Sequence, residues 1–297
     1  MTRRYRNLLI AFTAITLLLF GFTAASASAL LDMLHRPRTV IADLPGSEVV
    51  QIQSQDHLKL KAAWLSAPQP SGRCVLFLHG SGGWRGRSQR LTPWLLSAGY
   101  SVLAPDMRAH GESEGETITY GLLEQYDAIA WASWLRARGC VKVFGIGESL
   151  GASVLIMAAG LHPETSIFEA IAAECPFADL LESAEQYGLS QFPVPESLGA
   201  PFAKLAVATG SAYVRFSEGL DFTEVLPVRS IAAVRVPVLL IHGQADTRTS
   251  PSHSLELARA NPSHTELWLV PGARHVAAFT VAPAEYQRRV LALFAGK

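Results

Sequence analysis

The sequence predicts an α/β domain with a mostly parallel sheet covered by helices on both faces, and two observations support this. From Cys74 onward, short apolar runs that suit buried strands alternate with longer segments of helical periodicity. This alternation forms right-handed βαβ units, whose helices lie against both faces of a parallel sheet. The chain has 297 residues, 49% of them hydrophobic and 17% charged, which suits one large α/β domain or two small ones.

The expected elements follow from the spacing of apolar residues. Residues 47–66 alternate apolar and polar side chains on both sides of Gln55-Asp56, which predicts two strands joined by a tight turn at one edge of the sheet. Further strands are expected at 74–80, 100–106, 141–147, 170–176, 237–243 and 265–272. Helices are expected at 88–99, 121–139, 150–160, 250–260 and 283–294. Gly99 and Gly139 close the first two helices, as glycine commonly does at a helix C-terminus.

One segment, residues 176–235, breaks this alternation. It carries Phe, Pro, Gly and other aromatic residues with only partial helical patterning. An insertion after the sixth strand would cover one end of the sheet, so we expect a short cap at about 176–235 within a domain that spans 47–297.

The N-terminus is a separate segment. Three arginines among the first six residues precede a run without charge from Asn7 to Leu31, with A-x-A-like sites at 25–27 and 27–29. This pattern is typical of an export signal, and the run is also long enough to span a bilayer. A cleaved signal peptide and an uncleaved membrane anchor over residues 1–30 both fit. In either case the arginines stay cytoplasmic, which predicts an exported, extracytoplasmic or periplasmic domain.

Charge and cysteine content exclude several functions. The formal net charge is zero and no stripe of Lys or Arg is visible, so nucleic-acid binding is not expected. Cys74, Cys140 and Cys175 lack metal-ligand spacing, so no metal site is expected and buried free thiols are the default. If the strands that begin at Cys74 and Cys140 are neighbours, an exported chain allows a disulfide between them.

Three residues that suit nucleophilic catalysis fall at the ends of expected strands, where sites form in open α/β sheets. Ser149 lies in Gly147-Glu148-Ser149-Leu150-Gly151 between a strand and a helix, Asp246 follows a later strand, and His275 follows the last. A serine hydroxyl needs a base in contact, and imidazole titrates near neutral pH. We therefore interpret Ser149 as nucleophile, His275 as base and Asp246 as the group that orients His275.

An oxyanion needs two hydrogen-bond donors. The backbone N–H of Leu150 follows the nucleophile at a helix N-terminus, and the N–H of Ser81 lies in the glycine-rich loop after an earlier strand. Gly82, Trp84, Glu148 and Phe177 are candidates for the substrate pocket. Glu148 either caps the helix, faces solvent, or disfavours anionic substrates.

Other polar residues near strand ends have structural interpretations. Asp106, Arg108, His110 and Ser113 are expected to form a network below the site, with binding of a charged substrate group by the first two as the alternative. His79 and His242 are expected to make structural hydrogen bonds, and His253 to lie on the surface. Asp179 and Asp221 are rival acids, but both fall in the cap.

Five stretches, "HGSGG", "DMRAHGES", "GESLG", "HGQAD" and "PGARH", together resemble the α/β-hydrolase superfamily over about residues 47–297. The resemblance implies an eight-stranded sheet whose second strand is antiparallel, no cofactor, and Ser149, Asp246 and His275 as nucleophile, acid and base. "ECPFADL" followed by a modest cap is similar to the Bem46-like and serine aminopeptidase-like branches.

These observations predict a serine hydrolase that cleaves small or medium carboxylic esters through an acyl-enzyme intermediate. The same residues suit an amidase or peptidase, and a catalytically silent protein of this fold that binds a partner is the alternative from another class. The expected partners are a small-molecule ester or amide and, if the N-terminal segment is uncleaved, a membrane.

Overall fold

The computed structural model describes residues 5, 28, 31–32, 34–35, 44–190 and 195–297. The predicted signal or anchor at 1–30 therefore lies almost wholly outside the described residues. Within the described ranges, no helix combines the length and the apolar character needed to cross a membrane.

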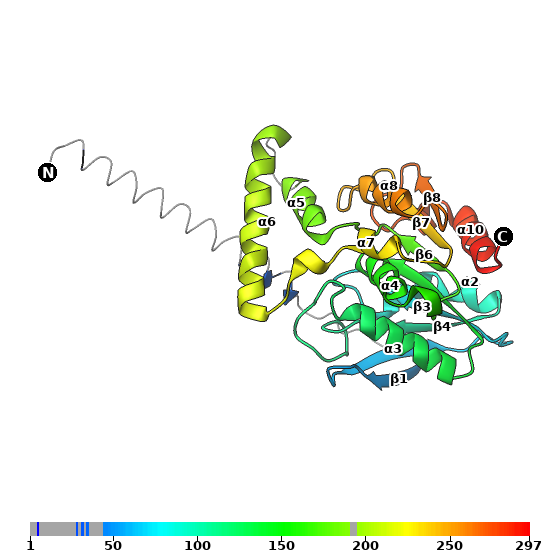
Figure 1. Ribbon diagram of the computed structural model, residues 1–297. Helices are drawn as coiled ribbons and strands as arrows, with labels where there is room; N and C mark the ends of the chain where they lie inside the picture. The colour runs from blue at the N-terminus through cyan, green and yellow to red at the C-terminus, as the bar shows by residue number, and fades with distance from the viewer. Residues whose placement is uncertain (1–4, 6–27, 29–30, 33, 36–43, 191–194) are drawn as a thin grey trace.

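Eight strands form one sheet in the order β1-β2-β4-β3-β5-β6-β7-β8 (Figure 1). Their bounds are β1 Glu48–Gln53, β2 Lys59–Leu65, β3 Arg73–Leu78, β4 Tyr100–Pro105, β5 Lys142–Glu148, β6 Ile171–Glu174, β7 Val238–Gly243 and β8 Thr265–Val270. β2 runs antiparallel to both β1 and β4, and the other neighbouring pairs are parallel. The predicted mostly parallel, eight-stranded sheet is confirmed, with its antiparallel hairpin at one edge.

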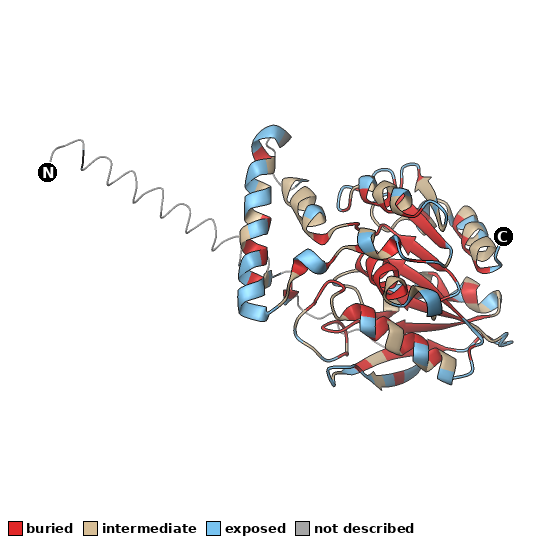
Figure 2. Ribbon diagram, in the orientation of Figure 1, coloured by how far each residue is buried: buried red, intermediate tan, exposed pale blue. Residues whose placement is uncertain are grey.

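Helices cover both faces of this sheet. One face carries α3 (Glu124–Ala137), α4 (Leu150–Leu161), α7 (Pro227–Ile231) and α8 (Pro251–Ala260), and the other carries α2 (Thr92–Ser97), α9 (Ala278–Val281) and α10 (Pro283–Phe294). Alternate residues of one strand serve the two layers: Leu76 packs with the first group and Phe77 with the second. Because both faces are covered, the central strands are buried along their length (Figure 2), which explains their continuous apolar runs.

The predicted ends of two helices are confirmed. Gly99 follows α2 with φ +81° and Gly139 follows α3 with φ +96°, so each has the left-handed backbone that glycine adopts without a steric penalty.

The segment between β6 and β7 contains α5 (Leu180–Ser190), α6 (Glu196–Glu218), a short 3-10 turn η3 (Phe222–Glu224) and α7. α7 contacts α4 and α8 and so belongs to the layer on the sheet. α5 and α6 pack against each other and stand away from the sheet, with α6 mostly exposed (Figures 1 and 2). Among the helices that the structure describes, these two alone project as a cap. The sequence pattern of this segment did not reveal the length of α6, because apolar residues lie on both of its faces.

A disulfide joins Cys74, in β3, to Cys140, two residues before β5. β3 and β5 are neighbouring strands, and the two Cα atoms lie 5.9 Å apart. The condition stated for this pairing from the sequence is therefore met. Cys175 is free and buried.

Candidate active site

Ser149 occupies a strained turn between β5 and α4. Its φ is 51° and its ψ is −115°, a conformation that is costly for a residue with a side chain. The flanking glycines are required by close packing. A Cβ on Gly147 would lie 2.6 Å from the backbone of Ala152, and one on Gly151 would lie 2.3 Å from the carbonyl oxygen of Leu78. This turn holds Ser149 at the carboxyl end of the sheet.

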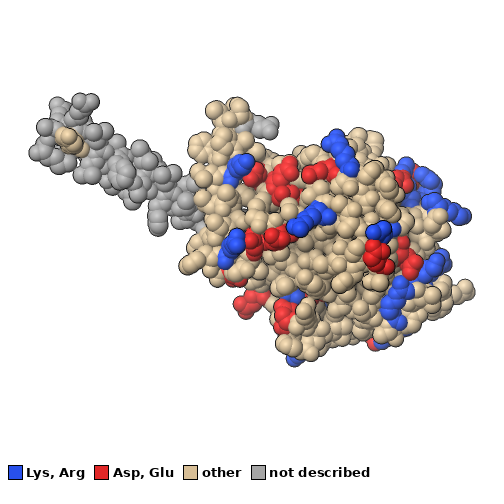
Figure 3. Space-filling model, viewed as in Figure 1, with Lys and Arg blue, Asp and Glu red and all other residues tan. Residues whose placement is uncertain are grey.

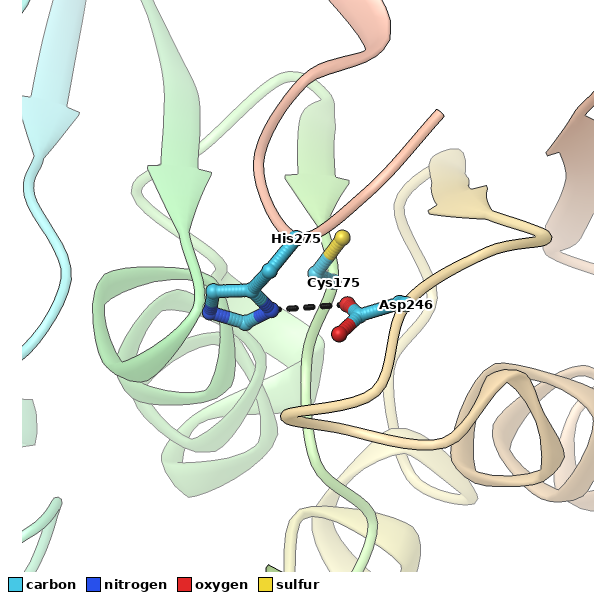
Figure 4. A group of neighbouring side chains, drawn as sticks. All are labelled: Cys175, Asp246 and His275. Atoms are coloured by element: carbon cyan, nitrogen blue, oxygen red, sulfur yellow. Dashed lines mark hydrogen bonds and ion pairs between the residues drawn. The ribbon is translucent and has the colours of Figure 1, made fainter. Parts of the chain in front are cut away.

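Asp246 and His275 form a hydrogen-bonded pair (Figure 4). Nδ1 of His275 lies 2.7 Å from Oδ2 of Asp246, while Oδ1 accepts from the backbone N–H groups of Arg248 and Thr249 at 2.9 and 3.0 Å. Burial raises the pKa of Asp246, but hydrogen bonds from His242 and His275 outweigh burial and leave the pKa well below its usual value. An ionised Asp246 accepts from Nδ1–H, which leaves Nε2 of His275 as the basic nitrogen.

A cavity of about 570 Å³ brings the other predicted site residues together. Its volume falls in the range of small-molecule sites, which is roughly 300–1,000 Å³. Asp246 is not on its wall and lies behind His275. The predicted residues that line it are Ser81, Gly82, Trp84, Glu148, Ser149, Leu150, Phe177 and His275.

The glycine-rich loop after β3 lies directly against the nucleophile candidate. A Cβ built on Gly80 would lie 3.2 Å from Cβ of Ser149. Leu150 is the first residue of α4, so its N–H has no carbonyl partner one turn earlier in the helix. The loop therefore lies beside Ser149, and the N–H of Leu150, which is unpaired within the described residues, directly follows that serine.

The hydrogen bonds of this loop distinguish its amides. The N–H of Gly82 donates to Nε2 of His110 at 3.0 Å, and the N–H of Gly83 donates to the carbonyl oxygen of Gly80 at 2.9 Å. In the part of the chain that the structure describes, the N–H of Ser81 donates to no group. Among residues 81–83, the amide predicted as the second donor is therefore the one left available.

Two histidines hold this loop. His79 donates from Nδ1 to the carbonyl oxygen of Gly80 at 2.8 Å and accepts from the N–H of Met107 at 3.1 Å. Burial lowers the pKa of His79 to about 3, with a smaller effect of His110, whose ring lies 4.9 Å away. The structural role expected for His79 is thus observed. The direct contact between His110 and Gly82 was not predicted, because no pattern in the sequence links residues 28 apart.

Asp106 and Arg108 form the structural network that was expected, and neither lines the cavity. Asp106 accepts from the backbone N–H and the guanidinium of Arg85 at 2.7 and 2.5 Å. Arg108 pairs with Asp127 and Asp56. The alternative that these residues bind a charged substrate group is wrong, since both are buried under the loops.

Glu148 lines the cavity as predicted, but the expectation that it caps the helix or faces solvent is wrong. It neither caps α4 nor faces solvent: its side chain is buried and bonded to the guanidinium of Arg90, which lies 3.4 Å from Glu174 as well. Burial raises the pKa of Glu148 to about 7, although Arg90 opposes the shift. Glu148 is the last residue of β5, so its side chain is directed into the packed layer, where only an arginine partner makes a carboxyl tolerable.

Positive charge, in contrast, lines the cavity. Arg87, Arg248 and Arg274 lie on its wall and are exposed. Among the described residues, the side chains of these three arginines make no ion pair with an acidic residue and no hydrogen bond. Three arginines therefore stand near Ser149, while the predicted effect of Glu148 on anionic substrates stays a prediction.

The remaining polar residues of the cap do not compete with Asp246. Asp179 accepts from the N–H of Leu181 at 2.7 Å at the start of α5, and Asp221 accepts from the N–H of Thr223 at the start of η3.

The prediction that His253 lies on the surface is wrong. It is buried in α8, where Nδ1 accepts from the N–H of Ala178 at 3.3 Å.

Two groups in the described residues have donor atoms close enough to hold a metal ion: Cys175, Asp246 and His275, and separately Glu182, His253 and Glu256. In the first group (Figure 4), burial raises the pKa of the Cys175 thiol well above its usual value, and Sγ accepts from the N–H of Val276 at 3.4 Å. A metal ion there requires a thiolate and loss of the hydrogen bond between Asp246 and His275. The group fits an acid–base pair better than a metal centre.

A sequence profile of the Alpha/beta hydrolase family matches residues 75–289, which includes every residue of the site. The chain belongs to the alpha/beta hydrolase family. The resemblance inferred from its motifs is thereby confirmed, while the branch within the family stays a prediction.

Members of this family with related sequences or structures include esterases and lipases. The Pyrococcus furiosus esterase Pf2001 is 27% identical, with a TM-score of 0.67 over 87% of this chain and 98% of that one. The uncharacterized protein YqkD of Bacillus subtilis is 26% identical over 75% of this chain and 72% of its own. The lysophosphatidylserine lipase ABHD12 of Gallus gallus is 34% identical, over 39% of this chain and 31% of its own.

Proposed function

We propose that this protein is a serine hydrolase that cleaves carboxylic esters through an acyl-enzyme intermediate. One observation carries the proposal: the strained Ser149 and the Asp246-bound His275 line the same cavity. Nε2 of His275 takes the proton of Ser149 as its oxygen attacks the ester carbonyl, and Asp246 stabilises the imidazolium that forms.

The backbone completes the reaction centre. The N–H groups of Ser81 and Leu150 stabilise the oxyanion of the tetrahedral intermediate. His275 then gives its proton to the leaving alcohol, and the acyl group stays on Ser149. Water deprotonated by His275 attacks this acyl-enzyme by the same route, which releases the acid and restores the serine hydroxyl.

Ester cleavage is favoured over amide cleavage because the related structures include an esterase, although the same residues serve an amidase. Arg87, Arg248 and Arg274 favour an ester substrate that carries an anionic group close to these three side chains.

The N-terminal run without charge and the disulfide, a bond typical of oxidising compartments, support an extracytoplasmic location.

Labelling of the full chain in detergent with a fluorophosphonate tests the proposal. We expect wild type to be labelled, Ser149→Ala to lose all labelling, and the matched variant Ser252→Ala, at an exposed serine of α8, to be labelled like wild type. Hydrolysis of p-nitrophenyl esters and anilides of the same acyl chain separates esterase from amidase activity. A folded wild type with neither labelling nor turnover would favour the silent binding protein.

A further inference from the structure

The cap helix α6 exposes large apolar side chains. Leu198 is 64% exposed, Phe202 66%, Leu205 44%, Tyr213 44% and Phe216 89%. These five residues, here called the apolar stripe, occupy a sector of about 80° on a helix that turns 100° per residue. Their spacing matches one continuous face of α6, so they form a single surface.

The other faces of α6 either pack against the protein or carry charged side chains. Val207 and Val214 are buried, and α6 packs against α5. Arg215 pairs with Asp221 at 3.0 Å. Burial raises the pKa of Glu185 in α5, and the charge of Lys204 opposes this shift. Figure 3 shows the outer side of α6 largely without charged side chains. A row of exposed aromatic and aliphatic residues without charge is typical of an interaction surface.

The N-terminal part of the chain enters the domain near the C-terminal end of α6. Leu34 is buried, and its carbonyl oxygen accepts from the N–H of Ile118 at 3.0 Å. Two residues further on, the ring of Tyr120 packs against Phe222, which follows α6, with ring centroids 6.1 Å apart. Leu31, the last residue of the uncharged run, packs against the core cluster that also contains Tyr120 and Phe222, near the C-terminal end of α6.

We infer that the apolar stripe of α6 docks on the surface of a phospholipid bilayer and inserts into its hydrocarbon edge. The chemistry of the stripe matches this occupant, because aromatic and aliphatic side chains on one face and charge on the others are typical of helices that lie in a membrane interface. The composition of the uncharged run supports the same occupant, since a run of this length and apolar character suits a membrane and its last residue, Leu31, packs on the domain near the end of α6.

The docked orientation places the cavity near lipid. α5 packs against α6, and Tyr187 and Ser183 of α5 line the cavity. If Ser149 is the nucleophile, as proposed above, the ester then reaches it from the membrane interface. The docking itself does not depend on catalysis.

Fluorescence of single labels on the full chain tests the docking. Phe202→Cys and Phe216→Cys are labelled with an environment-sensitive dye and reconstituted in phosphatidylcholine vesicles, with or without brominated acyl chains. Lys204→Cys, exposed on another face of the same helix, is the matched control, and wild type, whose Cys175 is buried, gives the background. We expect a blue shift and loss of fluorescence with brominated lipid at 202 and 216, and neither at 204.

Other occupants give different results. A blue shift at 216 without bromine quenching means that protein covers the stripe. If the shift grows with protein density, the covering protein is a second copy of the chain. If it does not, the chain's own N-terminal segment covers the stripe. Equal water exposure at 202, 204 and 216 means that nothing covers it. Either result overturns the proposal. Labelling of Ser149 by a fluorophosphonate is measured on the same samples, so failure of docking is distinguished from failure of the esterase assignment.

Discussion

The backbone N–H of Gly82 donates a hydrogen bond to Nε2 of His110 across 3.0 Å. This bond holds the loop whose Ser81 N–H is the proposed oxyanion donor, and Nδ1 of His110 in turn donates to the carbonyl oxygen of Arg108 at 2.8 Å. His110 touches no part of the proposed reacting atoms. We predict that it is a positioning residue for the proposed oxyanion site.

Replacing His110 by alanine is therefore expected to lower kcat for an ester by about tenfold, less than the roughly 10²–10³ lost with a whole oxyanion donor. KM is expected to change little, because the bond acts on the transition state and not on substrate binding. His110→Gln keeps a hydrogen-bond acceptor and should restore part of kcat. A variant that changes KM alone, or a glutamine variant no better than alanine, would show that His110 only fills space.

The three arginines of the cavity predict a preference among substrates. Arg87→Gln and Arg248→Gln are each expected to lower kcat/KM by about tenfold for an ester with an anionic group, since a charged hydrogen bond contributes roughly 1.5–3 kcal/mol before screening by solvent. A neutral ester of the same length should be cleaved at an unchanged rate. Arg235→Gln is the control, because Arg235 pairs with Glu164 away from the cavity. Equal losses for both esters would contradict a charge-specific role.

The sequence predicted the parts of this molecule that depend on local patterns. Continuous apolar runs gave the buried strands, and Gly147 and Gly151 revealed a turn in which a Cβ would collide with neighbouring backbone. The chain order of Ser149, Asp246 and His275 at strand ends was also visible, because parallel strands end at one edge of a sheet.

What the sequence did not reveal depends on contacts between distant residues. Glu148 looked like a surface or capping carboxylate, since nothing local shows that Arg90, 58 residues away, lies beneath it. The burial of His253 likewise depends on how the start of the cap folds over α8. The apolar stripe was hidden because the buried and exposed faces of α6 both carry apolar residues.

The disulfide between Cys74 and Cys140 predicts a stability that depends on redox conditions. It closes a loop of 66 residues, for which the loss of chain entropy in the unfolded state corresponds to about 4 kcal/mol. We expect a reductant, or the double replacement Cys74→Ala with Cys140→Ala, to lower the free energy of unfolding by about that amount in urea denaturation. Reductant should have no effect on the double variant, and Cys175→Ala should keep the full response of wild type.

His79 predicts how stability changes at acid pH. Its Nε2 accepts from the N–H of Met107, so the buried ring is neutral, and burial places its pKa at about 3 instead of the usual 6.5. Between these two values the unfolded chain binds a proton that the folded chain does not. The stability conferred by His79 is therefore complete above pH 6.5 and falls as the pH is lowered towards 3, by about 1.4 kcal/mol per pH unit.

Urea denaturation of wild type and His79→Gln at pH 7, 6 and 5 measures this effect. Glutamine keeps a donor and an acceptor but does not titrate, so the free energy of unfolding of wild type should fall more steeply with acid than that of the variant. The buried His253, whose pKa is lowered to about 4, titrates in the same direction in both proteins and cancels in the difference. If the free energy of unfolding changes with pH equally in wild type and variant, the ring of His79 accepts a proton in the folded protein. The N–H of Met107 would then have lost its acceptor.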